Sequence, residues 1–442
     1  MTSAMTSSTT SPGDVVDDLH RRGLIAQSTD ETELRAALAA GPVTYYCGFD
    51  PTAPSLHVGH LLQFMVLRAL HRAGHQPIVL VGGATGLIGD PRPTSERQLN
   101  DPAEVARWVD RIQRRVAPFL DLPAAELGLR APIYVNNLDW TAPLSAIDLL
   151  RDIGKHFRVN RMLAKEAVAV RLNSDVGISY TEFSYQILQA NDFRELHQRH
   201  GCTLQSGGSD QWGNITAGVD LVRRTDGAPA HALATPLLTT ADGKKIGKTE
   251  GATVWLDPEL TSPYAFFQYW LGIDDADARS WAPLFSERPA DEIAALVASS
   301  EERPQARELQ RALAEELTRL VHGEDELAQA EAAGRALFGR DDLAALGEGA
   351  LTAALSEAGA VQLGPDDLVD GALPSVAALL QRAGLCSSLS DARRTVKEGG
   401  AYLNNERVLD ADTPVPTDAG LAGRWVVLRR GKRAVAGVRL PS

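Results

Sequence analysis

Two short segments combine histidine or lysine with glycine in patterns that suit phosphate binding. His57-Val58-Gly59-His60 stands at the start of a helix-like stretch, where unpaired backbone N–H groups and the helix dipole favour an anion. Imidazoles there can donate hydrogen bonds to phosphate oxygens, and Gly59 lets a nucleotide approach the backbone. Lys245-Ile246-Gly247-Lys248-Thr249 places two lysines in a loop, where they can stabilise charge on a triphosphate. Taken alone, these segments are also compatible with a helix cap and an exposed basic loop.

Two common nucleotide-binding motifs are disfavoured by the sequence. With Gly243, the lysine segment is one residue short of a P-loop, and Glu250–Leu256 is typical of a loop and strand where a P-loop needs a helix. The glycine-rich segment Gly82–Pro91 follows a strand, but no Gly-x-Gly pair opens it, so the dehydrogenase fingerprint is missing. We therefore expect neither a P-loop ATPase nor a dinucleotide-dependent oxidoreductase.

Several polar side chains are candidates for binding a small substrate. Asp90 stands in a turn after a strand, where its carboxylate can bind an ammonium group. Tyr185, Gln189 and Asp192 follow an i, i+4, i+7 spacing, which places all three on one face of a helix. Such a face can also simply be solvated, so the spacing alone does not establish a site.

The elements that must position these residues alternate between strand and helix. Strand-like segments cover residues 43–49, 77–81 and 132–135, and helix-like segments cover residues 60–73, 159–172, 180–199 and 211–224. This alternation predicts an α/β fold in which helices cover a parallel sheet. Ligands in such folds bind at the carboxyl ends of the strands.

The rest of the chain changes in character, which predicts further domains. We expect an α/β catalytic domain over residues 1–262, an α-helical domain over 263–344, a partly ordered linker over 345–374 and a small α+β domain over 375–442. The formal net charge is −13, yet the last of these segments holds 11 Lys/Arg against 6 Asp/Glu. A basic terminal domain on an acidic body is compatible with RNA binding confined to one end.

Cysteine usage and apolar patterning favour a cytoplasmic protein. Cys47, Cys202 and Cys386 are far apart and form no CxxC pair, which supports neither a disulfide framework nor a zinc site. The Ser/Thr-rich first dozen residues lack the pattern of a secretory signal, and no apolar run approaches the length of a membrane span.

Together, these motifs resemble the bacterial-type tyrosyl-tRNA synthetases, which are class I aminoacyl-tRNA synthetases with a Rossmann-like catalytic domain. His57–His60 is similar to the family's HIGH motif, and Lys245–Thr249 is similar to its KMSKS loop. Tyr46–Thr52 and Gly207–Asn214 match longer and more specific stretches of the family. The resemblance extends from about residue 15 to the C-terminus.

The resemblance implies a binding role for each matched residue. The phenol hydroxyl of tyrosine would contact Tyr46 and Asp192, with Asn137 supporting this network. The ammonium group of tyrosine would contact Asp90, Tyr185 and Gln189, and its carboxylate would lie near Gln211. The adenosine side of ATP would contact Gly48, Asp50, Gly59, His60, Gly208 and Asp210, and the triphosphate would contact Thr52, His57, Lys245, Lys248 and Thr249. The stretch after Asp90 lacks a lysine that is common in the family, whereas Arg97 matches the family's arginine there.

The resemblance also implies the reaction and its partners. The tyrosine carboxylate would attack the α-phosphorus of ATP, and the terminal adenosine of tRNA(Tyr) would then take the tyrosine from the adenylate. Mg²⁺ would accompany ATP, with no protein metal site and no tightly bound cofactor. A homodimer formed through the catalytic domains is expected, with no membrane partner.

The C-terminal segment from Val376 to Asn404 resembles an S4 RNA-binding domain. The resemblance, and the charge of the segment, imply that a helix presenting Arg393, Arg394 and Lys397 could follow RNA phosphates. The segment is also compatible with a charged helix on a small domain of another kind.

Two other functions remain open at this point. Tryptophanyl-tRNA synthetases share the fold and both signature motifs, although Tyr46, Asp192 and the S4-like tail favour tyrosine. A catalytically silent RNA-binding paralogue belongs to another functional class, but the intact histidines and lysines of the two motifs argue for an enzyme.

Overall fold

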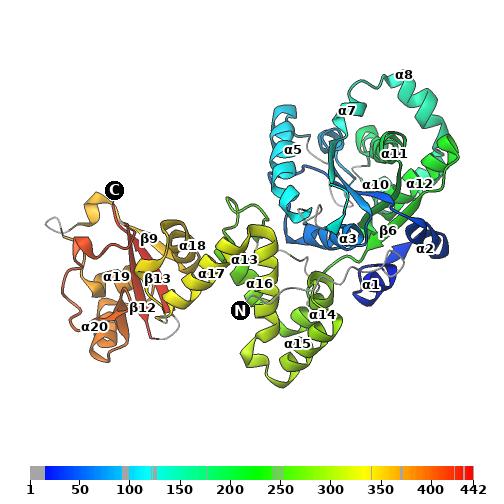
Figure 1. The fold of residues 1–442 in the computed structure, drawn as a ribbon. Coiled ribbons are helices and arrows are strands. Elements are labelled where there is room, and N and C mark those ends of the chain that lie inside the picture. Colours follow the sequence, from blue (N-terminus) through cyan, green and yellow to red (C-terminus); the bar gives the residue numbers. More distant parts are fainter. Residues whose placement is uncertain are drawn as a thin grey trace. The chain divides into compact units, whose positions relative to one another are not determined.

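The computed structural model divides into two compact units. Unit 1 comprises residues 1–257 and 274–309, and unit 2 comprises residues 258–273 and 310–442. The structure describes residues 15–91, 99–120, 122, 127–175, 177–241, 243, 246, 248–249, 252–339, 341–368, 372–422, 424–431 and 434–441. Each unit contains a sheet with helices packed on it (Figure 1).

A six-stranded sheet forms the centre of unit 1. Its strands are β1 (Gln27–Ser28), β2 (Thr44–Phe49), β3 (Gln76–Val81), β4 (Ile133–Asn136), β5 (Cys202–Gly208) and β6 (His231–Thr235). The spatial order is β1-β6-β5-β2-β3-β4, and every neighbouring pair is parallel except β1 with β6. The predicted parallel sheet is confirmed, and the predicted strands at 43–49, 77–81 and 132–135 correspond to β2, β3 and β4.

The helices of unit 1 follow the predicted alternation with strands. They are α1 (Val15–Arg21), α2 (Glu31–Ala40), α3 (Leu61–Arg72), α4 (Thr85–Ile88), α5 (Pro102–Val116), α7 (Leu138–Thr141), α8 (Ala146–Asp148), α9 (Val159–Leu163), α10 (Glu166–Leu172), α11 (Tyr180–His200), α12 (Trp212–Asp226), α14 (Asp275–Phe285) and α15 (Ala290–Glu302). The single helix predicted over 159–172 is wrong, because Lys165 adopts an extended backbone conformation that separates α9 from α10.

Strand β2 shows why both faces of the sheet are covered. Successive side chains of a strand point to opposite faces. The Tyr45 hydroxyl donates to the Leu67 carbonyl of α3, whereas the Tyr46 ring packs edge-on against Phe193 of α11 at 5.3 Å. Both tyrosines are almost fully buried. Helices α3 and α11 therefore pack on opposite faces of the sheet (Figure 1).

The carboxyl ends of the central strands lie at one edge of the sheet. Strand β2 leads to Asp50, β3 to the turn at Gly82, and β4 to Asn137. A Cβ atom on Gly82 would lie 2.2 Å from Asp50 Oδ1, so only glycine allows the β3 turn to approach the end of β2 this closely. Polar groups from three strands are thereby brought together.

Unit 2 contains a second sheet and the remaining helices. These helices are α13 (Pro263–Gly272), α16 (Glu308–His322), α17 (Glu324–Leu337), α18 (Glu348–Ala358), α19 (Val376–Arg382) and α20 (Leu389–Lys397). The strands are β9 (Ala360–Gln362), β10 (Ala401–Leu403), β11 (Glu406–Arg407), β12 (Trp425–Arg430) and β13 (Ala434–Arg439), in the order β11-β10-β12-β13-β9. Apolar residues of α19, such as Leu379 and Leu380, share a buried core with Val426 and Leu428 of β12.

The two units differ from the predicted domain ranges in two places. The segment 345–374, expected to be a linker, contains α18 and β9, and β9 pairs with β13. The helical segment 263–344 is divided, because α14 and the residues after it are tied to unit 1. Arg22 donates to the Pro283 carbonyl at 3.0 Å, and Arg68 pairs with Glu287 at 2.7 Å. The four predicted ranges themselves stay a prediction.

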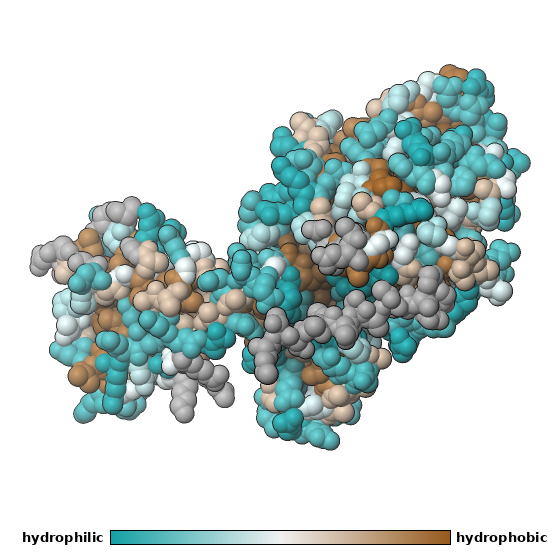
Figure 2. Space-filling view, viewed as in Figure 1, coloured by the Kyte–Doolittle hydropathy of each residue, from teal (hydrophilic) through white to brown (hydrophobic). Residues whose placement is uncertain are grey.

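Polar side chains dominate the visible surface of the molecule. Figure 2 shows hydrophobic patches between larger hydrophilic areas on both units. Within the described ranges, no helix is both long and apolar enough to cross a membrane.

Candidate active site

Asp192, in the middle of α11, is a buried carboxylate with two hydrogen-bond donors. Trp140 Nε1 donates to Oδ1 at 2.8 Å, and Asn137 Nδ2 donates to Oδ2 at 2.9 Å. Burial raises the pKa of Asp192 to about 7, while these two hydrogen bonds oppose the rise. An ionised carboxylate only accepts hydrogen bonds, so the two donors suit its charged form. Asp192 can therefore accept a further hydrogen bond from a ligand.

Two buried polar atoms near this carboxylate have no hydrogen-bond partner among the described residues. They are the Tyr46 hydroxyl and Gln189 Oε1. Burial raises the pKa of Tyr46 well above its usual value, and the nearby charge of Asp192 adds to the effect. Because buried polar groups are nearly always paired in native proteins, these atoms are candidates for contact with a ligand.

A chain of hydrogen bonds links Asp192 to the end of β2. Asn137 Nδ2 also donates to Thr85 Oγ1 at 3.0 Å, and Thr85 Oγ1 donates to Asp50 Oδ1 at 2.6 Å. The Tyr185 hydroxyl donates to the other oxygen of Asp50, also at 2.6 Å. This network connects α11, β2 and the turns after β3 and β4. It therefore fixes the position of the predicted tyrosine-binding residues relative to the predicted adenosine-binding residues.

Asp90 belongs to a second network. Gln211 Nε2 donates to Asp90 Oδ2 at 2.9 Å, and Asn214 Nδ2 donates to Oδ1 at 3.1 Å. Lys165 donates to Asn214 Oδ1, and burial lowers the pKa of this lysine to about 8 while the charge of Asp90 opposes the change. The structure thus brings Asp90 and Gln211, both predicted site residues, into direct contact, and Lys165 reaches them through Asn214.

The two histidines of the His57–His60 segment are arranged around the short helix η1 (Val58–His60). Gly59 N–H donates to His57 Nδ1, and His57 N–H donates to His60 Nδ1, both at 3.1 Å. Burial lowers the pKa of His60 to about 3, and the electrostatic influence of the neighbouring His57 contributes to a smaller degree. A ring whose Nδ1 accepts a hydrogen bond carries its proton on Nε2. Both imidazoles therefore offer a neutral Nε2–H donor.

The segment that follows the predicted lysine loop pairs with the histidine segment. Val58 N–H donates to the Val254 carbonyl at 3.0 Å, and Leu256 N–H donates to the Leu56 carbonyl at 2.9 Å. His57 lies opposite Trp255 in this antiparallel bridge. Residues 56–58 and 254–256, far apart in the sequence, are therefore joined through backbone hydrogen bonds.

Some predicted site residues cannot be placed, and others lie at the site's exposed edge. Lys245 and Arg97 lie outside the described residues, and Lys248 and Thr249 form the short strand β7 (Lys248–Thr249), paired with β8 (Ala252–Thr253). Four residues of the predicted ATP side are exposed or half-buried: Gly48, Thr52, Gly208 and Asp210. A Cβ atom on Gly59 would lie 2.9 Å from the His57 ring, so a side chain there would displace this imidazole.

Four residues that shape the site are not predicted from the sequence: Thr85, Trp140, Lys165 and Asn214. Thr85 and Asn214 belong to the segments Gly82–Pro91 and Gly207–Asn214, but their residue types give no reason to prefer them over their neighbours. Trp140 and Lys165 lie in segments with no motif, and only the fold brings them near Asp192 and Asp90. No periodic pattern in the sequence would have identified them.

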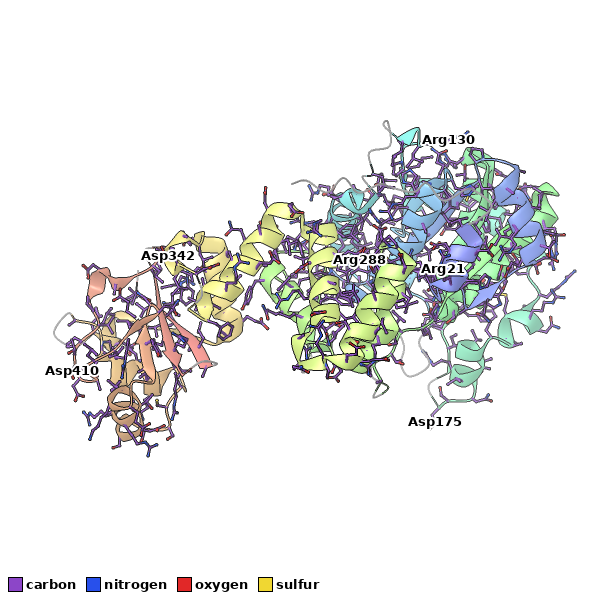
Figure 3. All side chains as sticks on the ribbon, turned by 60° about the horizontal axis from the view of Figure 1, so that its bottom comes forward. Arg21, Arg130, Asp175, Arg288, Asp342 and Asp410 are labelled. Atoms are coloured by element: carbon purple, nitrogen blue, oxygen red, sulfur yellow. The ribbon has the colours of Figure 1, made fainter. Side chains whose placement is uncertain are left out.

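The predicted RNA-binding side chains on α20 are exposed, and two of them form ion pairs. Arg393 pairs with Asp412 and Arg394 with Asp391, both at 2.8 Å. Asp412 N–H in turn donates to Asp410, which lies at the outer surface of unit 2 (Figure 3). Exposed pairs of this kind are weak, so RNA phosphates could compete for the arginines.

Comparison with known proteins identifies the family. Residues 38–339 match the family of tRNA synthetases class I (W and Y), and residues 368–436 match the tyrosine–tRNA ligase SYY-like C-terminal domain. The chain is 60% identical to tyrosine–tRNA ligase of Streptomyces griseus, with 97% of this chain and 99% of the relative covered. It is 58% identical to tyrosine–tRNA ligase of Streptomyces coelicolor, with coverage of 97% and 99%.

A solved structure supports the same assignment. A C-terminally truncated mitochondrial tyrosyl-tRNA synthetase of Aspergillus nidulans superposes with a TM-score of 0.66 at 30% identity, covering 73% of this chain and 94% of that one. The fold, the polar networks at the carboxyl ends of the strands and the full-length similarity agree. This chain therefore belongs to the class I tRNA synthetases of the tryptophan and tyrosine (W and Y) family.

Proposed function

We propose that this chain is a tyrosine–tRNA ligase. It activates L-tyrosine with ATP, giving tyrosyl-adenylate and pyrophosphate, and then transfers tyrosine to the 3′-terminal adenosine of tRNA(Tyr). The relatives that match almost its full length carry the name tyrosine–tRNA ligase. The observation in the structure that best supports this function is the buried Asp192 carboxylate beside the unpartnered hydroxyl of Tyr46.

These two groups favour tyrosine over the other aromatic amino acids. A phenol hydroxyl can donate to the carboxylate of Asp192 and accept from the hydroxyl of Tyr46 at the same time. The indole N–H of tryptophan only donates, and phenylalanine offers neither group. Either competitor would leave at least one buried polar group unpaired, which is costly.

The first reaction needs positioning and charge stabilisation rather than a strong base. The tyrosine carboxylate is already charged, and its oxygen forms a bond to the α-phosphorus as the bond to pyrophosphate breaks. In our proposal Asp90, Tyr185 and Gln189 hold the ammonium group of tyrosine, and Gln211 lies near its carboxylate. The Nε2–H groups of His57 and His60 donate to the triphosphate and the ribose, respectively.

The remaining matched residues complete the ATP side of the proposed site. Gly48, Asp50, Gly208 and Asp210 line the adenosine, with Gly59 allowing close approach. Thr52, Lys245, Lys248 and Thr249 contact the triphosphate, and Arg97 stands in the segment near the leaving pyrophosphate. Asn137 acts indirectly, because its amide orients the carboxylate of Asp192.

Mg²⁺ is proposed to enter with ATP. Within the described ranges, no cluster of three or more His, Cys, Asp or Glu side chains could hold a metal ion. Mg²⁺ often binds through substrate phosphates with few protein ligands, and we propose that mode here. When bound, the ion would neutralise charge on the phosphate oxygens.

A homodimer in the cytoplasm completes the proposal. Residues 138–180 of unit 1 expose several apolar side chains, which is unusual for a monomer: Leu138, Ile147, Leu150, Val159, Leu163 and Tyr180. We propose that they contribute to contact between two catalytic domains. Arg393, Arg394 and Lys397 are proposed to contact tRNA phosphates.

ATP–pyrophosphate exchange with purified protein and Mg²⁺ tests the function. Tyrosine, tryptophan and phenylalanine are each added separately, without tRNA. We expect exchange with tyrosine alone. Exchange with tryptophan instead would keep the family but overturn the proposed roles of Tyr46 and Asp192. No exchange with any amino acid, from folded protein, would favour an RNA-binding protein without synthetase activity.

A further inference from the structure

A buried carboxylate lies directly after the segment that pairs with the His57 region. Asp257 is fully buried, and its Oδ2 atom accepts from Arg111 Nε at 2.6 Å and from Arg115 Nε at 3.2 Å. Both arginines belong to α5 and are four residues apart, so they extend from the same helical face. The carboxylate therefore fixes the end of the 254–257 segment to helix α5.

The same helix is also fastened to α3, which begins immediately after the histidine segment. Arg68 of α3 donates to the carbonyl of Phe119, just beyond the end of α5. The Phe64 ring of α3 packs edge-on against Phe119 at 5.0 Å. Helix α5 thus has a fixed position relative to α3.

These contacts form a closed frame around His57. One side of the frame is the covalent connection from His57 into α3 and from there to α5. The other side runs from α5 through Asp257 to Trp255, which lies opposite His57 in the antiparallel bridge. Because the backbone at His57 is held from both sides, the imidazole of His57 has little freedom to move away from a ligand.

We propose that Asp257 is a positioning residue for the first reaction. Through Arg111 and Arg115, it holds the 254–256 segment against residues 56–58 and so orients His57 toward the triphosphate of ATP. This inference rests on the proposed function, since it concerns the same ATP side. Asp257 itself does not touch the substrates.

The test compares Asp257→Asn and Asp257→Ala with the unaltered protein in the exchange assay. Loss of the carboxylate should lower kcat for tyrosine-dependent exchange and raise KM for ATP, with kcat/KM for ATP falling about 10- to 100-fold. The asparagine variant keeps one acceptor oxygen and should retain more activity than the alanine variant. KM for tyrosine should change less than about twofold, because the described hydrogen bonds of Asp257 lead to helix α5 and not to the Asp192 network.

Asp391→Asn in unit 2 provides a matched control. Asp391 also accepts hydrogen bonds from two arginines, Arg394 and Arg430, and these three residues take no part in the contacts described around His57. Its replacement should lower thermal stability but leave kcat/KM for ATP within about twofold. Equal kinetic losses in both variants would overturn the inference, since they would reflect general destabilisation.

A double variant shows whether the effect passes through His57. In a His57→Ala background, Asp257→Asn should lower kcat/KM for ATP by less than about twofold further. Full additivity of the two losses would overturn the inference. Failure of the unaltered protein to exchange would instead concern the proposed function. If the unaltered protein and the Asp257→Asn variant both exchange normally, only the positioning role is refuted.

Discussion

The Tyr185 hydroxyl donates to Asp50 Oδ2 at 2.6 Å, which joins the N-terminal part of helix α11 to the end of strand β2. Family resemblance had placed Tyr185 at the ammonium group of tyrosine and Asp50 at the adenosine. Their hydrogen bond means that the two sides of the site share a structural element. A change in one residue should therefore be felt by both substrates.

Removing this hydrogen bond should affect ATP as well as tyrosine. We expect Tyr185→Phe to raise KM for both substrates in the exchange assay and to lower the free energy of unfolding by about 1.5–3 kcal/mol, because Asp50 loses a charge-assisted partner. Urea denaturation measures the second effect. Tyr402→Phe in unit 2, which keeps its ring beneath Arg429, should change neither quantity. A higher KM for tyrosine alone would argue against the shared role.

Replacing the buried carboxylate should weaken tyrosine binding selectively. We expect Asp192→Asn to raise KM for tyrosine by about 10- to 100-fold, because a hydrogen bond to a charged acceptor contributes about 1.5–3 kcal/mol. KM for ATP should stay within about threefold. Steady-state exchange kinetics at varied tyrosine and saturating ATP test this expectation. An unchanged KM for tyrosine would exclude Asp192 from phenol recognition.

Tyrosine binding should also depend on pH through the same carboxylate. The pKa of Asp192 is raised to about 7, chiefly by burial, so the acceptor is lost as the pH falls through that value. We expect the dissociation constant of tyrosine to be about tenfold higher at pH 6 than at pH 8. Isothermal titration calorimetry with tyrosine alone measures it, and the Asp192→Asn variant should lack the dependence. A flat profile for the unaltered protein would contradict the assignment.

A buried histidine away from the site should make the fold sensitive to acid. His75 accepts a hydrogen bond from Val43 N–H, and burial lowers its pKa to about 4, against about 6.5 in an unfolded chain. The unfolded state therefore takes up the proton first, and stability falls as the pH drops from 6.5 toward 4.

The matching variant is His75→Asn, which keeps an acceptor but does not titrate. Between pH 7 and pH 5 it should lose about 2 kcal/mol less stability than the unaltered protein, as measured by urea denaturation at both pH values. Equal losses in the two proteins would show that His75 does not control the response.

Hydrophobic periodicity and glycine turns were sufficient to predict the parallel sheet, helices α3, α11 and α12, and the shared face of Tyr185, Gln189 and Asp192. Contacts between distant segments were not accessible in this way. Arg111 and Asp257 are 146 positions apart, and neither residue belongs to a recognisable motif. Strand β9 was assigned to a linker because three residues carry too little pattern to reveal a pairing with β13.

The pairing of residues 254–256 with residues 56–58 has a consequence for the order in which the protein matures. Asp192, Tyr46 and their partners are all encoded before residue 215, whereas the bridge opposite His57 requires a segment about 200 residues further along than His57 itself. Closing so long a loop is entropically costly and slow. During synthesis on the ribosome, the amino-acid pocket should therefore form before the nucleotide side is complete, so that a nascent chain could recognise tyrosine without being able to activate it.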